Sequence, residues 1–461
     1  MNSLLIINGT IITSTSSRKE DLAVADGRIT KTGTLLPSDF PDHQIIDASG
    51  KLVFPGGIDP HVHLSLPTPA GLSSDDFVSG SRAAIAGGTT SFIDFVTPVR
   101  GQSLLEALAS RKKEAKSSLL DYGFHMGISE WNANSASEIH EIIEKEGISS
   151  FKTYLAYRES IGIDYPALQK VMEIVGSAGG IVLAHCEDGE MISHLQHEFV
   201  HTGKTDPKYH SQSHPAEAEI RAVEKVIEIS AKTNCPVYIV HTSTGNAAEA
   251  IRQAKESGLA VFAETCPQYL LLDESVYFSQ ADKMKILPYI ISPPIRKKNN
   301  QDQLWKGLAD GTFDTVATDH CPFNLYGQKD RGILDFTKIP NGAGGIEHRL
   351  TLLYAYGVLT NKITVQQFVN LTSTRPAEIF GLGNRKGKLE PGFDADIVIW
   401  DPDIKGIISV KNHFQNCDSD IYEGFPVQGK PCFVIVKGEI AFAEGTLRIN
   451  GLKGQFLMTK K

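Results

Sequence analysis

The sequence predicts an α/β protein in which a (β/α)8 TIM barrel carries a small β-sandwich domain formed from both chain ends. Through the middle of the chain, eight apolar strand-like segments alternate with segments of helical periodicity. Both ends instead show short alternating strands separated by tight turns. A chain of 461 residues is also too long for one ordinary core. We therefore expect a barrel over residues 56–384 and a sandwich built from residues 1–55 plus 385–461.

The first 55 residues are predicted to form short β-strands. Asn8-Gly9 lies between the apolar arms of LLIINGTIIT, and Asp26-Gly27 lies within LAVADGRITKTG. Both dipeptides suit the two-residue type I′ turn, which needs positive φ at both central positions. We expect a hairpin at each of them, in a segment too small to fold alone.

Each of the eight predicted barrel strands is a short apolar run. They are 58–63, 89–96, 121–129, 149–157, 180–186, 236–243, 259–266 and 313–320. Helical patterns with apolar residues three and four apart lie between most of them, at 102–116, 165–178, 216–232 and 246–257. A count of eight favours a closed barrel over an open doubly wound sheet. The stretch 320–345, rich in Gly, Pro and Asn, is long enough to be a functional loop.

The β pattern returns after about residue 385, with a turn at Lys437-Gly438. Because the two β-rich ends flank the barrel, we expect them to pair into one small domain. The last residues, 452–461, are polar and basic, and we expect them to be loosely held.

Composition and charge exclude several classes of partner. The formal net charge is −9 and no basic run occurs, which argues against a nucleic-acid partner. No apolar stretch is long enough to span a bilayer, and the N-terminus lacks the basic region of a signal peptide. The six cysteines show no CxxC spacing, which is typical of reduced thiols. We expect a cytoplasmic protein that binds neither nucleic acid nor membrane.

Two histidines, His61 and His63, follow an apolar strand in the stretch FPGGIDPHVHL. At the two-residue period of a strand, both imidazoles leave the same face. Imidazole is the commonest ligand of catalytic divalent metals, so the pair is a candidate for two metal ligands. The alternative is a pair of histidines hydrogen-bonded to loop carbonyls.

Four more candidate ligands fall near the ends of other predicted strands: Lys152, His185, His241 and Asp319. Barrel enzymes place catalytic residues at the C-terminal ends of their strands, so this coincidence indicates a shared site. Lys152 stands inside the apolar run SSFKTYLAY, where a buried ammonium would be costly. It is either paired with an acid inside the barrel or carbamylated by carbon dioxide, which would give a carboxylate able to bridge two metals.

Taken together, the motifs resemble the cyclic-amidohydrolase family, in its dihydropyrimidinase and D-hydantoinase (phenylhydantoinase-like) group. The resemblance runs through FPGGIDPHVHL, SFKTYLAY, AHCED, VHTS, ETCPQYLLLDES, ISPPIR, TDHCPF, IPNGAGGIEHR and PGFDADIVIWD. It implies a homotetrameric hydrolase that opens the cyclic amide C–N bond of small-molecule hydantoins or dihydropyrimidines. The alternatives are an allantoinase and a non-catalytic scaffold protein related to dihydropyrimidinase. Scaffold relatives lack several ligands, whereas all six positions are intact here.

The resemblance also implies a site with two divalent metal ions, for which zinc is expected. One ion would be held by His61, His63 and Asp319, and the other by the histidines of the AHCED and VHTS motifs. Carbamylated (N6-carboxylated) Lys152 would bridge the two ions. Asp319 would also act as general base and general acid, taking a proton from a bridging water and returning it to the leaving nitrogen.

Three further residues match substrate contacts of the family. Tyr157 matches its oxyanion-stabilising tyrosine, and Ser292 and Asn341 match its contacts to the ring amide, made mostly through backbone groups. The alternative for Tyr157 is a packed barrel aromatic. The alternative for Ser292 and Asn341 is a structural turn.

Other polar groups are interpreted as structural. Asp75-Asp76 and Glu187-Asp188 are expected to be loop or helix-start charges. The three histidines of 194–201 are expected to lie on a solvated helix face rather than to form a second metal site. His320 and Cys321 are expected to support the ligands rather than to bind metal.

The loops over the barrel mouth are predicted to set the choice of substrate. Ser65 stands where dihydroorotase-type relatives carry a carboxylate-binding arginine. By resemblance, the ring substituent points toward residues 64–72 and the end of the lysine strand. The apolar wall expected there consists of Leu66, Pro67, Leu72, Tyr154 and Ile161, with Arg158 as the one nearby charge. This wall predicts a preference for hydantoins with aromatic or alkyl 5-substituents over dihydrouracil.

Overall fold

The computed structural model describes residues 3–279 and 281–459. At its centre lies an eight-stranded parallel sheet in the order β17-β16-β15-β14-β13-β12-β11-β8. The strands are β8 (Gly57–Val62), β11 (Thr89–Val96), β12 (Asp121–Ile128), β13 (Ser150–Tyr154), β14 (Ile181–His185), β15 (Val237–Ile239), β16 (Val261–Thr265) and β17 (Thr315–Val316). Each falls within or beside one of the eight predicted strands, so the (β/α)8 fold class is confirmed.

The sheet closes into a barrel between its first and last strands. Val62 at the end of β8 forms a parallel bridge with His320, just beyond β17. The fully buried Arg349 lies at this seam, and its Nη1 donates to the carbonyls of Ile58 (2.8 Å) and Val316 (3.0 Å). Because β17 is only two residues long, it forms few backbone hydrogen bonds, and the Arg349 guanidinium supplies further hydrogen bonds to backbone carbonyls at the seam.

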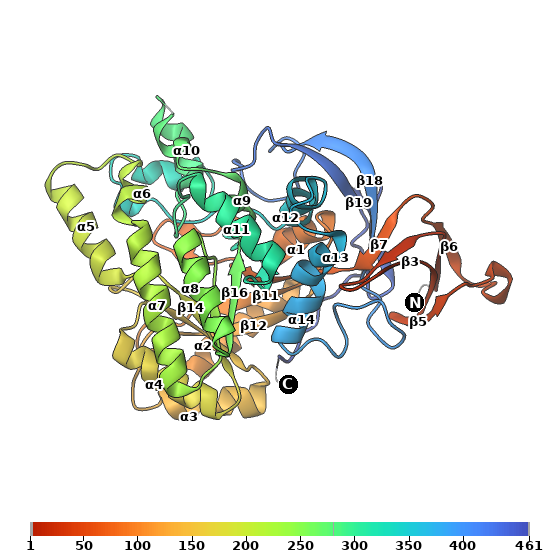
Figure 1. Ribbon diagram of the computed structural model, residues 1–461, viewed down its shortest axis with the longest axis horizontal. Coiled ribbons are helices and arrows are strands. Elements are labelled where there is room, and N and C mark those ends of the chain that lie inside the picture. Colours follow the sequence, from red (N-terminus) through yellow and green to blue (C-terminus); the bar gives the residue numbers. More distant parts are fainter. Residues whose placement is uncertain (1–2, 280, 460–461) are drawn as a thin grey trace.

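Helices surround the barrel (Figure 1). The longer ones are α1 (Phe77–Ala86), α2 (Leu104–Glu114), α4 (Tyr165–Ser177), α5 (Gly189–His201), α7 (Ala216–Thr233), α8 (Gly245–Glu256) and α11 (Asn299–Asp310). The shorter ones are α3 (Ser135–Glu141), α6 (Tyr209–Ser213), α9 (Pro267–Leu271), α10 (Ser275–Phe278), α12 (Arg349–Leu353), α13 (Val365–Val369) and α14 (Arg375–Ile379). The four helices predicted from periodicity correspond to α2, α4, α7 and α8. Across the described ranges, no helix is both long and apolar enough to cross a membrane.

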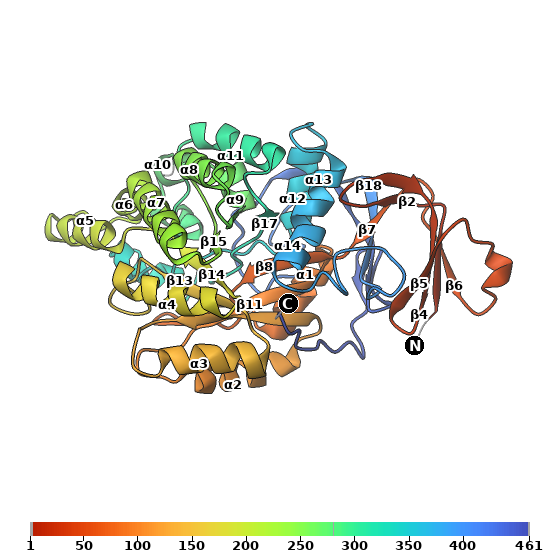
Figure 2. The ribbon, with the colours of Figure 1, turned by 60° about the horizontal axis from the view of Figure 1, so that its bottom comes forward.

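Strands from both chain ends form two more sheets beside the barrel, on the side away from α5 (Figures 1 and 2). A four-stranded sheet, in the order β5-β4-β1-β6, contains β1 (Leu4–Ile7), β4 (Asp21–Ala25), β5 (Arg28–Gly33) and β6 (Gln44–Asp47). A seven-stranded sheet, in the order β21-β20-β19-β18-β7-β2-β3, contains β2 (Thr10–Ile12), β3 (Ser17–Lys19), β7 (Leu52–Pro55), β18 (Ile397–Ile407), β19 (Pro426–Val436), β20 (Glu439–Ala443) and β21 (Thr446–Leu447). A small ribbon, β9 (Pro67–Thr68) with β10 (Gly71–Leu72), lies apart from both.

The two chain ends meet inside the seven-stranded sheet. N-terminal β7 pairs antiparallel with C-terminal β18, with Val53 opposite Ile399. Leu4 and Val24 of the four-stranded sheet pack into the same buried cluster as Val53 and Ile399. The two sheets therefore share one apolar core, as predicted for a sandwich formed from both chain ends.

Of the three predicted turns, two are confirmed and one prediction is wrong. Asn8-Gly9 does not form a hairpin, because β1 and β2 pair in different sheets. Gly9 is needed for close packing, since a Cβ there would lie 2.7 Å from Val53 Cγ2. Asp26-Gly27 (φ 52° and 75°) and Lys437-Gly438 (φ 47° and 79°) do form hairpins, with both residues in the left-handed region that a type I′ turn requires.

The C-terminal segment is packed rather than loose, so this expectation is wrong for residues 452–459. The Leu457 amide donates to the Tyr122 carbonyl (2.7 Å), and the Thr459 amide donates to the Gly147 carbonyl (2.8 Å). Leu457 and Thr459 are both buried. Backbone hydrogen bonds to the barrel hold this segment, and its polar composition gave no indication of them.

Candidate metal centre and active site

The barrel strands bring the first three predicted ligands into mutual contact. His61 Nε2 and His63 Nε2 lie 3.2 Å apart, and Asp319 Oδ1 lies 3.2 Å from each of them. Burial lowers the pKa of His63 to about 4, although hydrogen bonding to Asp319 opposes this effect. Ligands that bind zinc tetrahedrally at about 2.0–2.1 Å lie about 3.3 Å from one another. The three atoms therefore stand at the spacing that a metal ion requires.

The second pair of histidines lies next to the first group. His185 Nδ1 lies 2.9 Å from His241 Nε2, and the imidazoles of His241 and His61 are 5.4 Å apart between ring centroids. Ligand atoms of His61, His241 and Asp319 all lie within 4.8 Å of one another. The arrangement therefore offers two adjoining sets of ligands at one mouth of the barrel.

Lys152 is fully buried on β13, close to both sets of ligands. Its Nζ has no hydrogen-bond partner among the described residues, and it makes no ion pair with an acid in that part of the chain. The ammonium lies 4.8 Å from the Phe95 ring centroid and 5.1 Å from that of Tyr154. Burial lowers the pKa of Lys152 to about 8, despite the opposing charge of Asp319. An orphaned buried amine fits a group that becomes a carboxylate and binds metal, and it does not fit the acid-paired alternative.

Glu264 on β16 orients this centre and was missed by the sequence analysis. Its Oε1 is hydrogen-bonded to His61 Nδ1 and accepts the His241 amide (3.0 Å), while its Oε2 accepts the Tyr238 hydroxyl (2.7 Å). A carboxylate on the far nitrogen of a metal-binding imidazole fixes the ring and raises its basicity. The available signal was an acidic residue inside the apolar run 259–266, where a buried carboxylate must have partners.

Glu187 is also a buried partner of a candidate ligand, His185, so its interpretation as a loop charge is wrong. Its carboxylate lies 2.9 Å from His185 Nε2 and 3.1 Å from His214 Nδ1. Burial raises the pKa of Glu187, but the two imidazoles outweigh it and hold the pKa well below its usual range. The neighbouring Asp188 behaves as predicted, because its side chain caps the start of α5.

Asp75 and Asp76 also differ from each other in their contacts. Asp76 caps α1, as predicted, by accepting the amides of Val78 and Ser79. Asp75 is instead fully buried, where its Oδ2 lies 3.1 Å from His320 Nε2. The expectation of a loop or helix-start charge is therefore wrong for Asp75, which supports the residue next to Asp319. The three histidines of 194–201 are exposed on α5, as predicted.

The three predicted substrate contacts gather beside the ligands. Ser292 and Asn341 lie beside the Tyr157 hydroxyl, and Asn341 Nδ2 donates to Ser292 Oγ (3.2 Å). The Tyr157 ring lies 5.4 Å from the His185 ring. Burial raises the pKa of Tyr157, so its hydroxyl keeps its proton and can donate it in a hydrogen bond.

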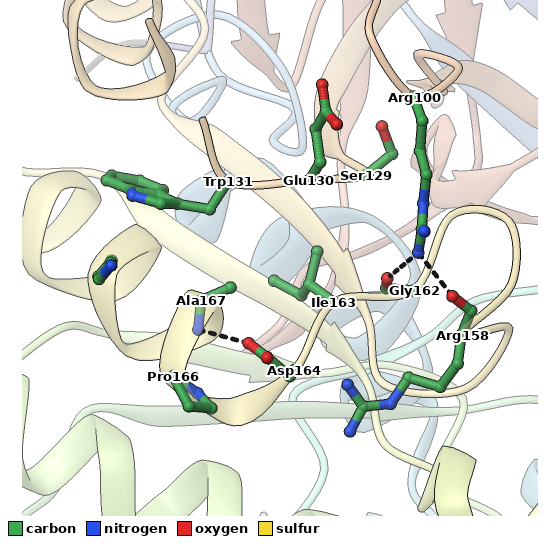
Figure 3. Close-up of a pocket in the computed structure, with 11 residues that line it drawn as sticks. Arg100, Ser129, Glu130, Trp131, Arg158, Gly162, Ile163, Asp164, Pro166 and Ala167 are labelled. Atoms are coloured by element: carbon green, nitrogen blue, oxygen red, sulfur yellow. Dashed lines mark hydrogen bonds between the residues drawn. The ribbon is translucent and has the colours of Figure 1, made fainter. Parts of the chain in front are cut away.

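Arg100 holds the loop that carries Tyr157 (Figure 3). Its Nη2 donates to the carbonyls of Arg158 (2.6 Å) and Gly162 (3.0 Å), which lie on either side of the loop tip. Asp164 ends the loop by accepting the Ala167 amide (2.8 Å) at the start of α4. The loop is therefore fastened at both ends.

The predicted apolar wall is only partly assembled. Leu66 and Pro67 line a cavity of about 180 Å³ together with Phe95. Tyr154 is buried, with its ring 6.0 Å from that of His185. Leu72 is 56% exposed on β10, so it does not close the wall as predicted.

Two remaining residues of this region lie at its edge. Ile161 is half-buried in the loop after β13. Arg158 is partly exposed, with its guanidinium 3.7 Å from Glu190. The role of the wall in choosing the substrate stays a prediction.

The fold and this constellation match one family of metal-dependent hydrolases. Residues 52–441 match the amidohydrolase family, and the chain belongs to it. It is 40% identical to a D-hydantoinase of Geobacillus stearothermophilus, over 94% of this chain and 92% of that protein. It is 39% identical to a D-phenylhydantoinase of Escherichia coli (strain K12), over 99% of this chain and 98% of that one.

Solved structures agree with this assignment. The crystal structure of dihydropyrimidinase from Brevibacillus agri matches with a TM-score of 0.97 at 38% identity, over 99% of this chain and 98% of that chain. The family resemblance predicted from the motifs is therefore confirmed.

Proposed function

We propose that the protein opens the cyclic amide C–N bond of hydantoins or dihydropyrimidines, using two divalent metal ions, zinc by preference. The observation that carries the proposal is the convergence of four histidines and Asp319 beside the buried, unpartnered Nζ of Lys152. A scaffold protein would have no need for this costly arrangement of buried polar groups. The full-length similarity to D-hydantoinases supports a hydantoinase over an allantoinase.

The ligands divide into two sets in this proposal. His61, His63 and Asp319 would hold one ion, His185 and His241 would hold the other, and carbamylated Lys152 would supply a carboxylate to both. When bound, the two ions would polarise the scissile carbonyl and lower the pKa of a water molecule. For carbamylation, the ammonium first loses one proton, and the neutral Nζ then bonds to the carbon of carbon dioxide and releases a second proton. The two steps together turn a cation into an anion.

Asp319 moves the proton in the proposed reaction. It takes a proton from the attacking water and returns it to the ring nitrogen as the C–N bond breaks. Burial raises the pKa of Asp319, but the charge of His61 and hydrogen bonds from His61 and His63 outweigh it and hold the pKa well below its usual range. The carboxylate is therefore ionised, which is the form that a general base requires.

Tyr157, Ser292 and Asn341 bind the substrate. The Tyr157 hydroxyl donates to the oxygen on which negative charge develops. Ser292 and Asn341, which lie beside that hydroxyl, hold the ring amide so that its carbonyl faces the candidate ligands. We propose hydantoins with an aromatic or alkyl substituent at C5, in the D configuration, as the preferred substrates.

A turnover panel with zinc-loaded enzyme tests this function. D- and L-5-phenylhydantoin, hydantoin, dihydrouracil, allantoin and dihydroorotate would each be assayed for ring opening. The proposal expects the highest kcat/KM for D-5-phenylhydantoin. A tenfold preference for dihydrouracil would make the chain a pyrimidine-degrading enzyme, and a preference for allantoin would make it an allantoinase. No turnover of any ring would leave the scaffold alternative.

Asp319→Asn provides the sharpest single-residue test of the mechanism. It should lower kcat by about 10² to 10⁴ through loss of the proton carrier. Circular dichroism should show an intact fold. A variant that keeps more than about a tenth of the wild-type kcat would remove Asp319 from this role.

The assembly and the compartment belong to the same proposal. All six cysteines are free thiols, which supports a reducing, cytoplasmic setting. A homotetramer is proposed from family resemblance alone, and light scattering of the purified enzyme would test it.

A further inference from the structure

A second group of metal-binding side chains lies outside the barrel mouth, where the connection between β18 and β19 meets the start of α12. His348 Nε2 lies 2.8 Å from Asp420 Oδ2, and His413 Nδ1 lies 3.5 Å from the same oxygen. Ligand atoms of all three residues lie within 4.8 Å of one another. Their side chains are 9%, 4% and 1% exposed for His348, His413 and Asp420, so the group is buried.

Gln415 provides a fourth polar group at the same point. Its Nε2 lies 3.3 Å from His348 Nε2 and 3.4 Å from His413 Nδ1. Its Oε1 is buried and has no hydrogen-bond partner within the described ranges of the chain. Turning the amide by 180° would exchange the two atoms and direct the carbonyl oxygen at both imidazoles.

The hydrogen bonds within this group leave one buried acceptor over. His413 Nε2 donates to the Cys417 carbonyl (3.0 Å), so a neutral His413 turns the lone pair of Nδ1 toward both the Asp420 carboxylate and the Gln415 amide. His348 Nε2 can donate to Asp420, but Gln415 Oε1 then has no partner among the described residues. A cation at the centre would receive a lone pair from each of the four groups, and it would offset the contact between the Nδ1 lone pair and the carboxylate.

We propose that His348, His413, Asp420 and the Gln415 side-chain carbonyl form a further divalent-cation site, separate from the barrel mouth, for a transition ion of the zinc class. The contacts of 2.8–3.5 Å bracket the spacing of about 3.3 Å expected between ligands around tetrahedral zinc. Two imidazoles select such an ion over calcium or magnesium. The hydrogen bond from His413 Nε2 to a backbone carbonyl is the outer contact that metal-binding histidines make.

The site has an entry route and a structural role. A cavity of about 300 Å³, lined in part by Glu347 and His348, opens beside it. Within the same connection, the Asn416 amide donates to Asp75 Oδ1 (2.9 Å), and Asp75 Oδ2 contacts His320 next to Asp319. An ion here would fasten residues 408–425 against the segment that supports the catalytic mouth.

Metal counting with matched variants tests the site. Full-length protein would be loaded with zinc, freed of unbound ion by gel filtration, and measured for metal per chain. The wild type should hold one equivalent more than His413→Ala and one more than the isosteric Asp420→Asn. His197→Ala, which removes an exposed histidine on α5, should keep the wild-type content. Because the result is a difference, it does not depend on how many ions the barrel mouth holds.

A second measurement isolates the site spectroscopically. In Lys152→Ala loaded with cobalt, the remaining ion should show the intense visible absorption of tetrahedral cobalt. Adding His413→Ala to that variant should abolish it.

Two results would overturn the proposal: equal zinc content in the wild type and both cluster variants, or no tetrahedral cobalt signal in folded Lys152→Ala. Either would leave the histidines as protonated partners of Asp420. If the wild type opened no cyclic amide yet lost one equivalent on His413→Ala, the proposed function would fail while this site stood.

Discussion

Three residues of the candidate active site have a backbone conformation that side chains other than glycine rarely adopt. Tyr157 (φ 57°), His241 (φ 38°) and Asp319 (φ 55°) all lie in the left-handed region. Each such residue costs about 1–3 kcal/mol, which the surrounding fold must offset. All three come directly after or near the end of a barrel strand. The strain is consistent with turning the phenol, imidazole and carboxylate toward one point.

Substitutions of Lys152 test the two-metal proposal most directly. Lys152→Ala should be poor in metal and lose more than about 100-fold in kcat, because even an outer contact of a metal site is worth about 10- to 100-fold. Lys152→Arg should fail as well, since a guanidinium stays cationic and cannot be carbamylated. A short carboxylic acid added with zinc should restore part of the alanine variant's activity. Wild-type metal content in Lys152→Ala would contradict the bridging role.

Tyr157→Phe separates transition-state stabilisation from packing. Removing one donor to a developing oxyanion costs about 10²–10³ in kcat, and KM should change much less. Initial-rate kinetics on the best substrate of the panel would measure both constants. Tyr209→Phe, on α6, is the matched control and should leave kcat unchanged. If Tyr157→Phe kept the wild-type kcat, the hydroxyl would be no more than a packing contact of Ser292 and Asn341.

At this scale, the sequence predicted the candidate ligands that the barrel brings together but not the acidic residues that contact them. The candidates could be found because polar residues interrupt strand ends at regular places along the chain. Glu264 and Glu187 could not be assigned in the same way. Glu264 stands inside an apolar run, and its partners His61 and Tyr238 are 203 and 26 residues away in sequence. Only the closed barrel brings them together.

Among the elements, the loop after β13 connects the lysine strand to α4 and carries Tyr157 at its start. Its position depends on Arg100, which follows β11 and reaches two of its carbonyls. The guanidinium therefore couples the loop after β11 to the loop after β13, two strands further along the barrel.

Arg100→Ala should lower kcat about three- to tenfold, or ~0.7–1.4 kcal/mol of activation free energy. Each hydrogen bond to a charged group contributes about 1.5–3 kcal/mol to stability. Only a part of this energy should affect the activation free energy, because Arg100 acts on the reaction through the position of Tyr157. Lys170→Ala is the control. Lys170 lines the same surface pocket as Arg100, but it has no hydrogen bond to the loop carbonyls. Unchanged kcat in Arg100→Ala would show that Tyr157 is held without this fastening.

Turn chemistry predicted the conformation of a turn more reliably than the sheet to which its strands belong. Asn8 does adopt positive φ, as an Asn-Gly pair suggests, yet the strands on either side of it separate into two sheets. Each of these strands has one partner about forty residues away in sequence, as shown by Ile45 opposite Leu5 and Val53 opposite Ile11, and these two partners lie in different sheets. Local sequence carries no information about those partners.

For the whole molecule, the count of eight strands and the β-rich ends were enough to predict the architecture. The attachment of the barrel to the sandwich was not predictable, because it depends on charges that are buried between them. Lys386 Nζ donates to Asp121 on β12 (2.8 Å) and to Asp396 just before β18 (2.6 Å), and lies 3.2 Å from Asp394. Its side chain is 1% exposed.

Lys386→Met should destabilise the protein by about 3–5 kcal/mol, because removing one partner leaves buried carboxylates without compensation. Lys405→Met, on an exposed part of β18, is the control and should have little effect on stability. Thermal melting of the metal-loaded proteins would measure both. If Lys386→Met does not fold, Lys437→Met removes the half-exposed second cation bound to Asp121 and should give a smaller loss in the same direction.

The pH dependence of that loss tests its electrostatic origin. Burial lowers the pKa of Lys386, but the charges of Asp396 and Asp121 outweigh burial and raise it. The contribution of Lys386 to the free energy of unfolding is therefore complete below about pH 10.4, and it is lost only as pH rises through the folded-state pKa. Burial alone raises the pKa of Asp121, and the charges of Lys386 and Lys437 reverse this shift. Without Lys386, the carboxylates should keep raised pKa values and bind more protons folded than unfolded. The stability of Lys386→Met then falls as pH rises above about 3.9. Its melting temperature should therefore approach that of the wild type as pH is lowered from 7.5 to 5. A difference that stays constant over this range would mean that Lys386 acts through packing and not through its charge.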